Sequence, residues 1–206
     1  MDHAQPRSAS LSRTAARATL HCLTGCAIGE VLGMVIGTGL GLSNAVTVVL
    51  SIALAFFFGY SLTMLPLVRS GLALALVIPI AFASDTFSIA VMEIVDNGVM
   101  IGVPGALNAG LADILFWGAL GLSLVIAFAA AFPVNRYLIA RGSGHAVVHG
   151  LSSGGTLPAN LNPRRLVLVG VLAIAVTITA GAIGASIATR DEPDTSHTSR
   201  SGRVSR

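Results

Sequence analysis

The chain contains no lysine and has few charged residues of any kind. Aspartate, glutamate, lysine and arginine together make up 10% of its 206 residues, whereas 54% are hydrophobic. A soluble globular domain has about a quarter of its residues charged. This scarcity of charge excludes an ordinary soluble domain and indicates an integral membrane protein.

Other absences narrow the class further. The 12 basic residues are all arginines and are spread over predicted loops and tails, so no single basic patch is available for nucleic acid. The two cysteines, Cys22 and Cys26, lie in one predicted helix, which excludes a disulfide framework. The first apolar run is too long for a signal peptide, contains Glu30 and is followed by no A-x-A cleavage site, so we predict a retained membrane span.

Five apolar stretches have at least about 20 residues, enough to cross a hydrocarbon core about 30 Å thick. The predicted fold is therefore all-α, a polytopic transmembrane helix bundle of four core helices plus a fifth C-terminal helix. We predict the five spans at about 19–41, 44–65, 71–97, 108–132 and 166–188, with an apolar Gly/Pro-containing connection at 98–107 and Pro133 ending the fourth span. The predicted organisation is a disordered cytoplasmic tail over 1–16, a four-helix membrane domain over 17–150, a cytoplasmic linker over 151–165, the fifth helix over 166–188 and a disordered tail over 189–206.

The arginines predict the orientation of the chain. They occur in the N-terminal tail, in the loop after the second span and in the loop after the fourth, while the other two loops have none. By the positive-inside rule, the N-terminus is expected in the cytoplasm and the C-terminus outside. We expect a multi-pass protein of a bacterial inner membrane. The C-terminal tail, which has four arginines, is the exception to this pattern.

The first span contains two stripes of residues at four-residue spacing. On a helix, Cys22, Cys26 and Glu30 share one stripe. The stripe beside it consists of His21 followed by small residues, which are Gly25, Gly29, Gly33 and Gly37. Small residues at this spacing allow a second membrane helix to approach closely, so we predict that these four glycines pack against another helix.

Five acidic residues lie in or beside the predicted spans, and none has a basic partner in a span. They are Glu30, Asp85, Glu93, Asp96 and Asp113. An ionised carboxylate at mid-bilayer costs about 2.5–3.5 kcal/mol. Each acid must therefore be protonated, hydrogen-bonded, hydrated or bound to a cation. We expect Asp96 and Asp113 to lie on the outer part of a proton or cation path.

Thiol, imidazole and carboxylate groups together suggest a metal site. The predicted ligands are His21, Cys22, Cys26, Glu30, Asp85 and Glu93, with His145 and His149 as cytoplasmic ligands if they share a helical turn. This ligand set favours a copper or zinc ion. Ordinary packing is the alternative for the cysteines, and solvation in a loop is the alternative for the two histidines. The sequence HAVVH lacks the glutamate of a zinc protease motif.

The leading functional hypothesis is binding or translocation of a cation, either a transition metal or a proton. The alternative is a non-enzymatic accessory or assembly protein that docks a partner through the glycine stripe. A membrane thiol enzyme using Cys22 and Cys26 is a third, less favoured hypothesis, and we do not predict an enzyme. Because four or five helices are few for a transporter, a homo-oligomer or a membrane partner is expected in addition to the lipid bilayer.

Four segments of the chain resemble a known family. They are HCLTGCAIGE at 21–30, MEIVDN at 92–97, PGALNAGLADILFW at 104–117 and RGSGHAVVH at 141–149. Together they resemble an uncharacterised bacterial membrane protein family known only as a domain of unknown function, over about residues 18–150. The resemblance implies a four-span unit with the histidine-containing loop, and it implies no activity or ligand.

Overall fold

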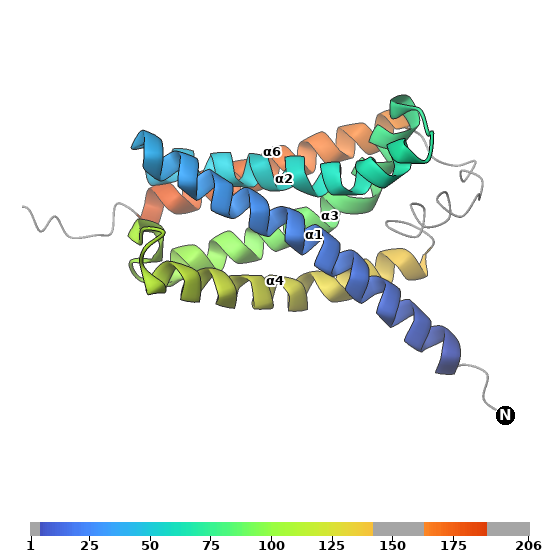
Figure 1. Cartoon of the computed structure of the whole chain (residues 1–206), viewed down its shortest axis with the longest axis horizontal. Coiled ribbons are helices and arrows are strands. Elements are labelled where there is room, and N and C mark those ends of the chain that lie inside the picture. The colour runs from blue at the N-terminus through green and yellow to red at the C-terminus, as the bar shows by residue number, and fades with distance from the viewer. Residues whose placement is uncertain (1–4, 142–162, 189–206) are drawn as a thin grey trace, which may run out of the picture.

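The computed structural model describes residues 5–141 and 163–188, and within these ranges the secondary structure is helical. The elements are α1 (Gln5–Leu40), α2 (Asn44–Arg69), α3 (Leu74–Gly102), the short 3-10 helix η1 (Ala106–Asn108), α4 (Ile114–Ala140) and α6 (Pro163–Ala188) (Figure 1). The described residues include 5 helices that are long and apolar enough to cross a membrane. The predicted all-α transmembrane bundle is therefore confirmed.

Several helix boundaries differ from the predictions. Residues 5–16, expected as a disordered tail, form the first turns of α1. This segment has no glycine, and its only proline, Pro6, lies in the first turn, where a missing N–H is tolerated. Helix α4 continues through Pro133 to Ala140, and α3 continues to Gly102. Within a membrane bundle, packing against neighbouring helices supports a helix through a single proline.

Helix α3 is the central element of the bundle. It packs against α1, α2, α4 and α6, while α1 pairs most extensively with α2. Helix α6 packs on α2 and α3 and so belongs to the same bundle. Of the five spans, α3 also has the largest share of its most apolar segment buried, 50%. Several polar groups on α3 are accordingly shielded from lipid, among them Ser84, Asp85, Ser88 and Glu93, which are at most 1% exposed.

The glycine stripe of α1 faces α2 of the same chain. All four glycines, Gly25, Gly29, Gly33 and Gly37, leave no room for a side chain on this face. A Cβ atom on Gly25 would lie 2.6 Å from the Cα atom of Gly59, and one on Gly29 would collide with the backbone of Ala55. The two backbones therefore approach closely, as small residues permit in membrane helices. The surface suggested for docking a partner is occupied by α2.

The arginines of the described residues gather at one end of the bundle. They lie near the start of α1, the end of α2, the end of α4 and the start of α6, and Figure 1 shows these helix ends together on the right. We call this end the arginine end. Helix α6 finishes at the opposite end, so the first and last helices have their free ends on opposite sides (Figure 1).

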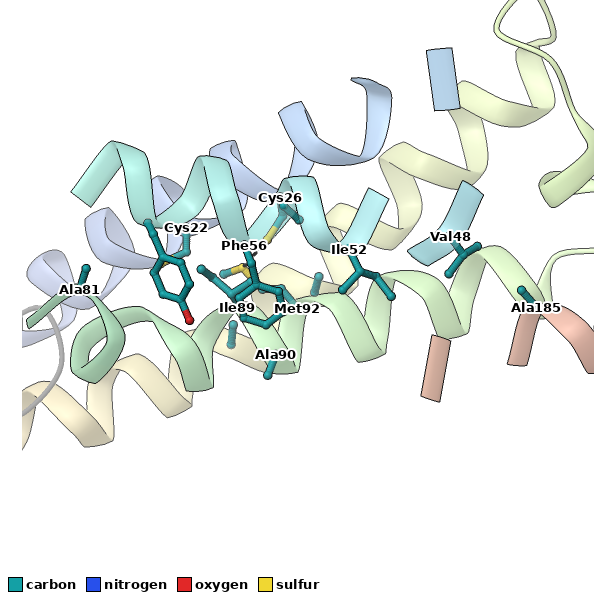
Figure 2. Packing of buried hydrophobic residues seen from close by; sticks show 14 residues of the cluster. Cys22, Cys26, Val48, Ile52, Phe56, Ala81, Ile89, Ala90, Met92 and Ala185 are labelled. Atoms are coloured by element: carbon teal, nitrogen blue, oxygen red, sulfur yellow. Dashed lines mark hydrogen bonds between the residues drawn. The ribbon is translucent and has the colours of Figure 1, made fainter. Parts of the chain in front are cut away.

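Buried apolar side chains form three clusters along the bundle. The central one includes Cys22, Cys26, Phe56, Ile89 and Met92 (Figure 2). A small cluster of Leu67, Val77 and Ile80 lies at the arginine end. The cluster at the opposite end, which we call the apolar plug, consists of Met34, Met100, Ala106, Ala109, Phe116, Ala119 and Leu120. The buried polar residues of α3 lie between these outer clusters.

Candidate functional site

Four carboxyl groups lie buried inside the bundle. Asp85, Glu93 and Asp96 of α3 are 0%, 1% and 2% exposed, and Glu30 of α1 is 5% exposed. The α3 acids are separated by eight and three residues, which places them on one helix face. With a rise of 1.5 Å per residue, Asp85 and Asp96 are about 16 Å apart along α3, about half the thickness of a hydrocarbon core. We call these four residues the carboxyl file.

The part of the carboxyl file nearest the arginine end is a cluster around Asp85. The Cys22 Sγ atom lies 3.9 Å from Asp85 Oδ1, within hydrogen-bonding distance for sulfur. The side chains of His21 and Thr63 also interact with Asp85, and His21 Nε2 is 3.2 Å from Thr63 Oγ1. Helices α1, α2 and α3 therefore each place a proton-carrying group in this cluster.

The middle of the file contains sulfur atoms as well as a carboxyl group. The Cys26 Sγ atom is 4.0 Å from Met92 Sδ, and the Cys26 thiol also interacts with the Glu93 carboxyl group. The side-chain amide of Asn97 donates to the Glu93 backbone carbonyl at 2.9 Å and to its Oε2 atom at 3.4 Å. Figure 2 shows Cys26 of α1 and Met92 of α3 facing each other beside Phe56.

Three carboxyl groups meet in the part of the file nearest the apolar plug. Glu30 interacts with Asp96 and with Glu93, which brings α1 against α3. The Ser123 hydroxyl of α4 donates a hydrogen bond to Asp96 Oδ1 and is fully buried. Sequence reasoning missed Ser123. A small hydroxyl group in the middle of an otherwise apolar span is the signal that could have identified it.

Positive charge is absent from the middle of the file. The sequence has no arginine or lysine between Arg17 and Arg69 or between Arg69 and Arg136. Glu93 Oε1 and Asp96 Oδ2 accept no hydrogen bond from the described residues. A buried, unbalanced carboxylate is strongly unfavourable, so this part of the file is stable only when protons, water or cations compensate its charge.

A second polar network holds the helices in register beside the file. The Asn135 amide of α4 donates to Thr19 Oγ1 of α1 at 3.0 Å and to Ser88 Oγ of α3 at 2.9 Å. The Tyr60 hydroxyl of α2 lies 2.8 Å from Thr86 Oγ1 of α3. These hydrogen bonds join α3 to α2 and to α4, and α4 to α1, and so help to determine which face of α3 carries the file toward α1 and α4.

The structure brings together only part of the predicted site. Within residues 5–141 and 163–188, no three or more histidine, cysteine, aspartate or glutamate side chains are placed to hold a metal ion. The predicted ligands instead lie along the bundle, because they are separated by whole helical turns. His145 and His149 fall outside the described residues.

Asp113, predicted for the outer path, lies apart from the carboxyl file. It is exposed, and its carboxylate accepts a hydrogen bond at 2.9 Å from the backbone N–H of Leu115, thereby capping α4. The first N–H groups of a helix lack partners within the helix, which explains why an aspartate is favoured at this position.

Large apolar side chains cover the outside of the bundle, including Leu168, Leu172 and Val176 on α6, which are 59%, 57% and 60% exposed. Apolar outer faces, buried polar groups and the five long helices of the described residues define a membrane-spanning helical protein. The chain belongs to the family described as Domain of unknown function (DUF4396), which matches residues 12–144. The match includes most of α1 and all of α2 to α4, and it confirms the predicted membership of an uncharacterised family, while α6 lies outside it. No curated protein and no solved structure matches the chain.

Proposed function

We propose that this membrane protein binds protons and moves them along the carboxyl file. The observation that carries the proposal is the burial of four carboxyl groups in one file between α1, α3 and α4, with no basic residue in the middle of the spans. Intramembrane acids of this kind typically mark ion pathways and proton relays. In this proposal the arginine end faces the cytoplasm of a bacterial cell.

The chemistry of the file suits a proton better than a divalent metal ion. A zinc ion in a protein has three or four protein ligands at about 2.0–2.3 Å. The described residues offer no such group of histidine, cysteine and acidic side chains. A proton needs only one oxygen at a time, and the cluster around Asp85, the Glu93 carboxyl group and the pair of Glu30 and Asp96 supply successive sites.

The two ends of the file differ in a way that supports controlled access. At the arginine end, the half-buried His21 interacts with Asp85 and thus connects the file to the surface. At the opposite end, the apolar plug separates Asp96 from the outside, and its Phe116 side chain is 0% exposed. Apolar constrictions block ions by excluding water. Proton release at this end therefore requires the plug to open or to become hydrated.

Proton flux into liposomes tests the proposal. The purified full-length chain is reconstituted with a pH-sensitive dye inside, and a potassium diffusion potential drives proton entry. We expect flux above that of protein-free liposomes, and a loss of about tenfold or more in Asp96→Asn and in Glu30→Gln, corresponding to about 1.4 kcal/mol or more of added barrier. Asp113→Asn is the matched control because Asp113 is exposed and asparagine also caps helices well.

The same assay can reject the proposal that the protein moves protons. Wild-type flux equal to that of empty liposomes would reject it, provided that the protein is shown to be inserted. So would wild-type flux in both Asp96→Asn and Glu30→Gln. A loss in Asp113→Asn equal to that in the file variants would show that the effect is not specific to the buried acids.

A further inference from the structure

The sulfur atoms of Cys26 and Met92 lie next to each other in the central apolar cluster. They come from different helices, α1 and α3, and their Sγ and Sδ atoms are 4.0 Å apart. Cys26 is 3% exposed and Met92 is 0% exposed. Figure 2 shows the two side chains directed toward each other. The proposed proton pathway runs through carboxyl groups and does not require this pair.

We propose that Cys26 and Met92 bind a soft monovalent metal ion, of the Cu(I) or Ag(I) class. Thiolate and thioether ligands select Cu(I) over harder ions. With metal–sulfur bonds of about 2.3 Å, as for zinc thiolates, two ligands of a trigonal site have their sulfur atoms about 4.0 Å apart. The observed separation of 4.0 Å therefore matches the sulfur–sulfur distance of such a site.

A carboxyl group beside Cys26 is available to accept the proton that metal binding releases. When the metal–sulfur bond forms, the S–H bond of Cys26 breaks, and the Glu93 carboxyl group, which interacts with this thiol, accepts the proton when it is itself deprotonated. The ion keeps its oxidation state, so no electron donor or acceptor is needed. Cys22 lies one helical turn before Cys26 in α1, is also buried and interacts electrostatically with Cys26, while its sulfur atom contacts Asp85.

This site differs from the one expected from the sequence. The expected set combined thiol, imidazole and carboxylate ligands for copper or zinc, and the described residues do not assemble it. Met92 is not among the ligands expected from the sequence. Its role as a ligand follows only from its position opposite Cys26, and it does not depend on proton movement along the file.

Silver binding to the purified full-length protein tests the site without copper redox chemistry. We expect one Ag(I) per chain by elemental analysis and a loss of affinity of about tenfold or more in Met92→Leu. Leucine has a similar volume to methionine, so this variant removes the sulfur while preserving the packing. The matched control is Met100→Leu, at another buried methionine of α3, which should bind silver like the wild type. X-ray absorption of the silver-bound protein should show at least two sulfur atoms around the ion.

Three results would overturn the proposal. The first is the absence of stoichiometric silver in the folded wild-type protein. The second is equal affinity in Met92→Leu and Met100→Leu, which would mean that a cysteine alone captures the metal adventitiously. The third is a silver ion with a single sulfur neighbour. Cys26→Ser should abolish binding, but if this variant fails to fold, the methionine pair still decides the question.

Discussion

Replacing Gly25 by alanine should loosen the pairing of α1 with α2. The added Cβ atom would lie 2.6 Å from Gly59 Cα and 2.7 Å from Gly59 N, both backbone atoms that cannot rotate away. Ordinary contacts begin at 3.4 Å, so the helices would have to separate locally by about 0.8 Å. A gap of that size forfeits about a quarter to a half of the dispersion energy of each affected contact.

The expected magnitude follows from two opposing terms. Overpacking costs about 1–3 kcal/mol, and the upper half of that range applies because the neighbours are backbone atoms. Alanine recovers up to about 1 kcal/mol through its better helix propensity. The net loss is about 1–2 kcal/mol, which lowers the unfolding temperature by about 2–8 °C in a chain of this size.

The assay is the fraction of detergent-solubilised protein that stays monodisperse by size-exclusion chromatography after heating. Gly39→Ala is the control, since Gly39 lies in the same helix and has no neighbouring atom within 4 Å of the position of a Cβ. The control should equal or slightly exceed the wild type. If Gly25→Ala were as heat-resistant as Gly39→Ala, the close approach of α1 and α2 would not contribute to stability as argued.

Three further substitutions test other parts of the bundle. Asn135→Ala removes two interhelical hydrogen bonds and should destabilise the protein by about 1 kcal/mol in the same heating assay. Thr179→Ala, on the exposed face of α6, should have a smaller effect. Equal effects of the two substitutions would contradict the role of the hydrogen-bond network. Tyr60→Phe keeps the ring but loses the hydrogen bond to Thr86, so the free energy of unfolding should decrease by about 0.6 kcal/mol. An unchanged unfolding temperature would mean that this hydrogen bond does not contribute to stability. Phe116→Ala should open the apolar plug and raise proton flux into liposomes several-fold. Val125→Ala, which replaces a 68% exposed side chain, should leave the flux unchanged. Unchanged flux in folded Phe116→Ala would mean that the plug does not limit proton flux.

Much of the fold follows from the sequence because membrane helices are determined locally. The length of each apolar run, compared with the thickness of a bilayer, predicts the number of spans. The helical period places Asp85, Glu93 and Asp96 on one face of α3 and the glycines on one face of α1. Helix ends were less predictable. Residues 5–16 and the segment after Pro133 are helical because short polar extensions and single prolines are tolerated when the adjoining helix is already formed.

The amino-acid sequence by itself determined the class of protein, the five spans of the described residues and the presence of acids within them, since a bilayer tolerates few charges and each span satisfies its own backbone. Only the tertiary structure decided which faces meet: that Glu30 lies against Asp96, that Ser123 reaches the same carboxylate, that Met92 faces Cys26, and that the glycine stripe receives α2 rather than a partner. The physical reason is that lipid tails are as apolar as leucine, so hydropathy does not indicate which apolar face turns inward. That choice depends on close packing and on hydrogen bonds between residues far apart in the chain.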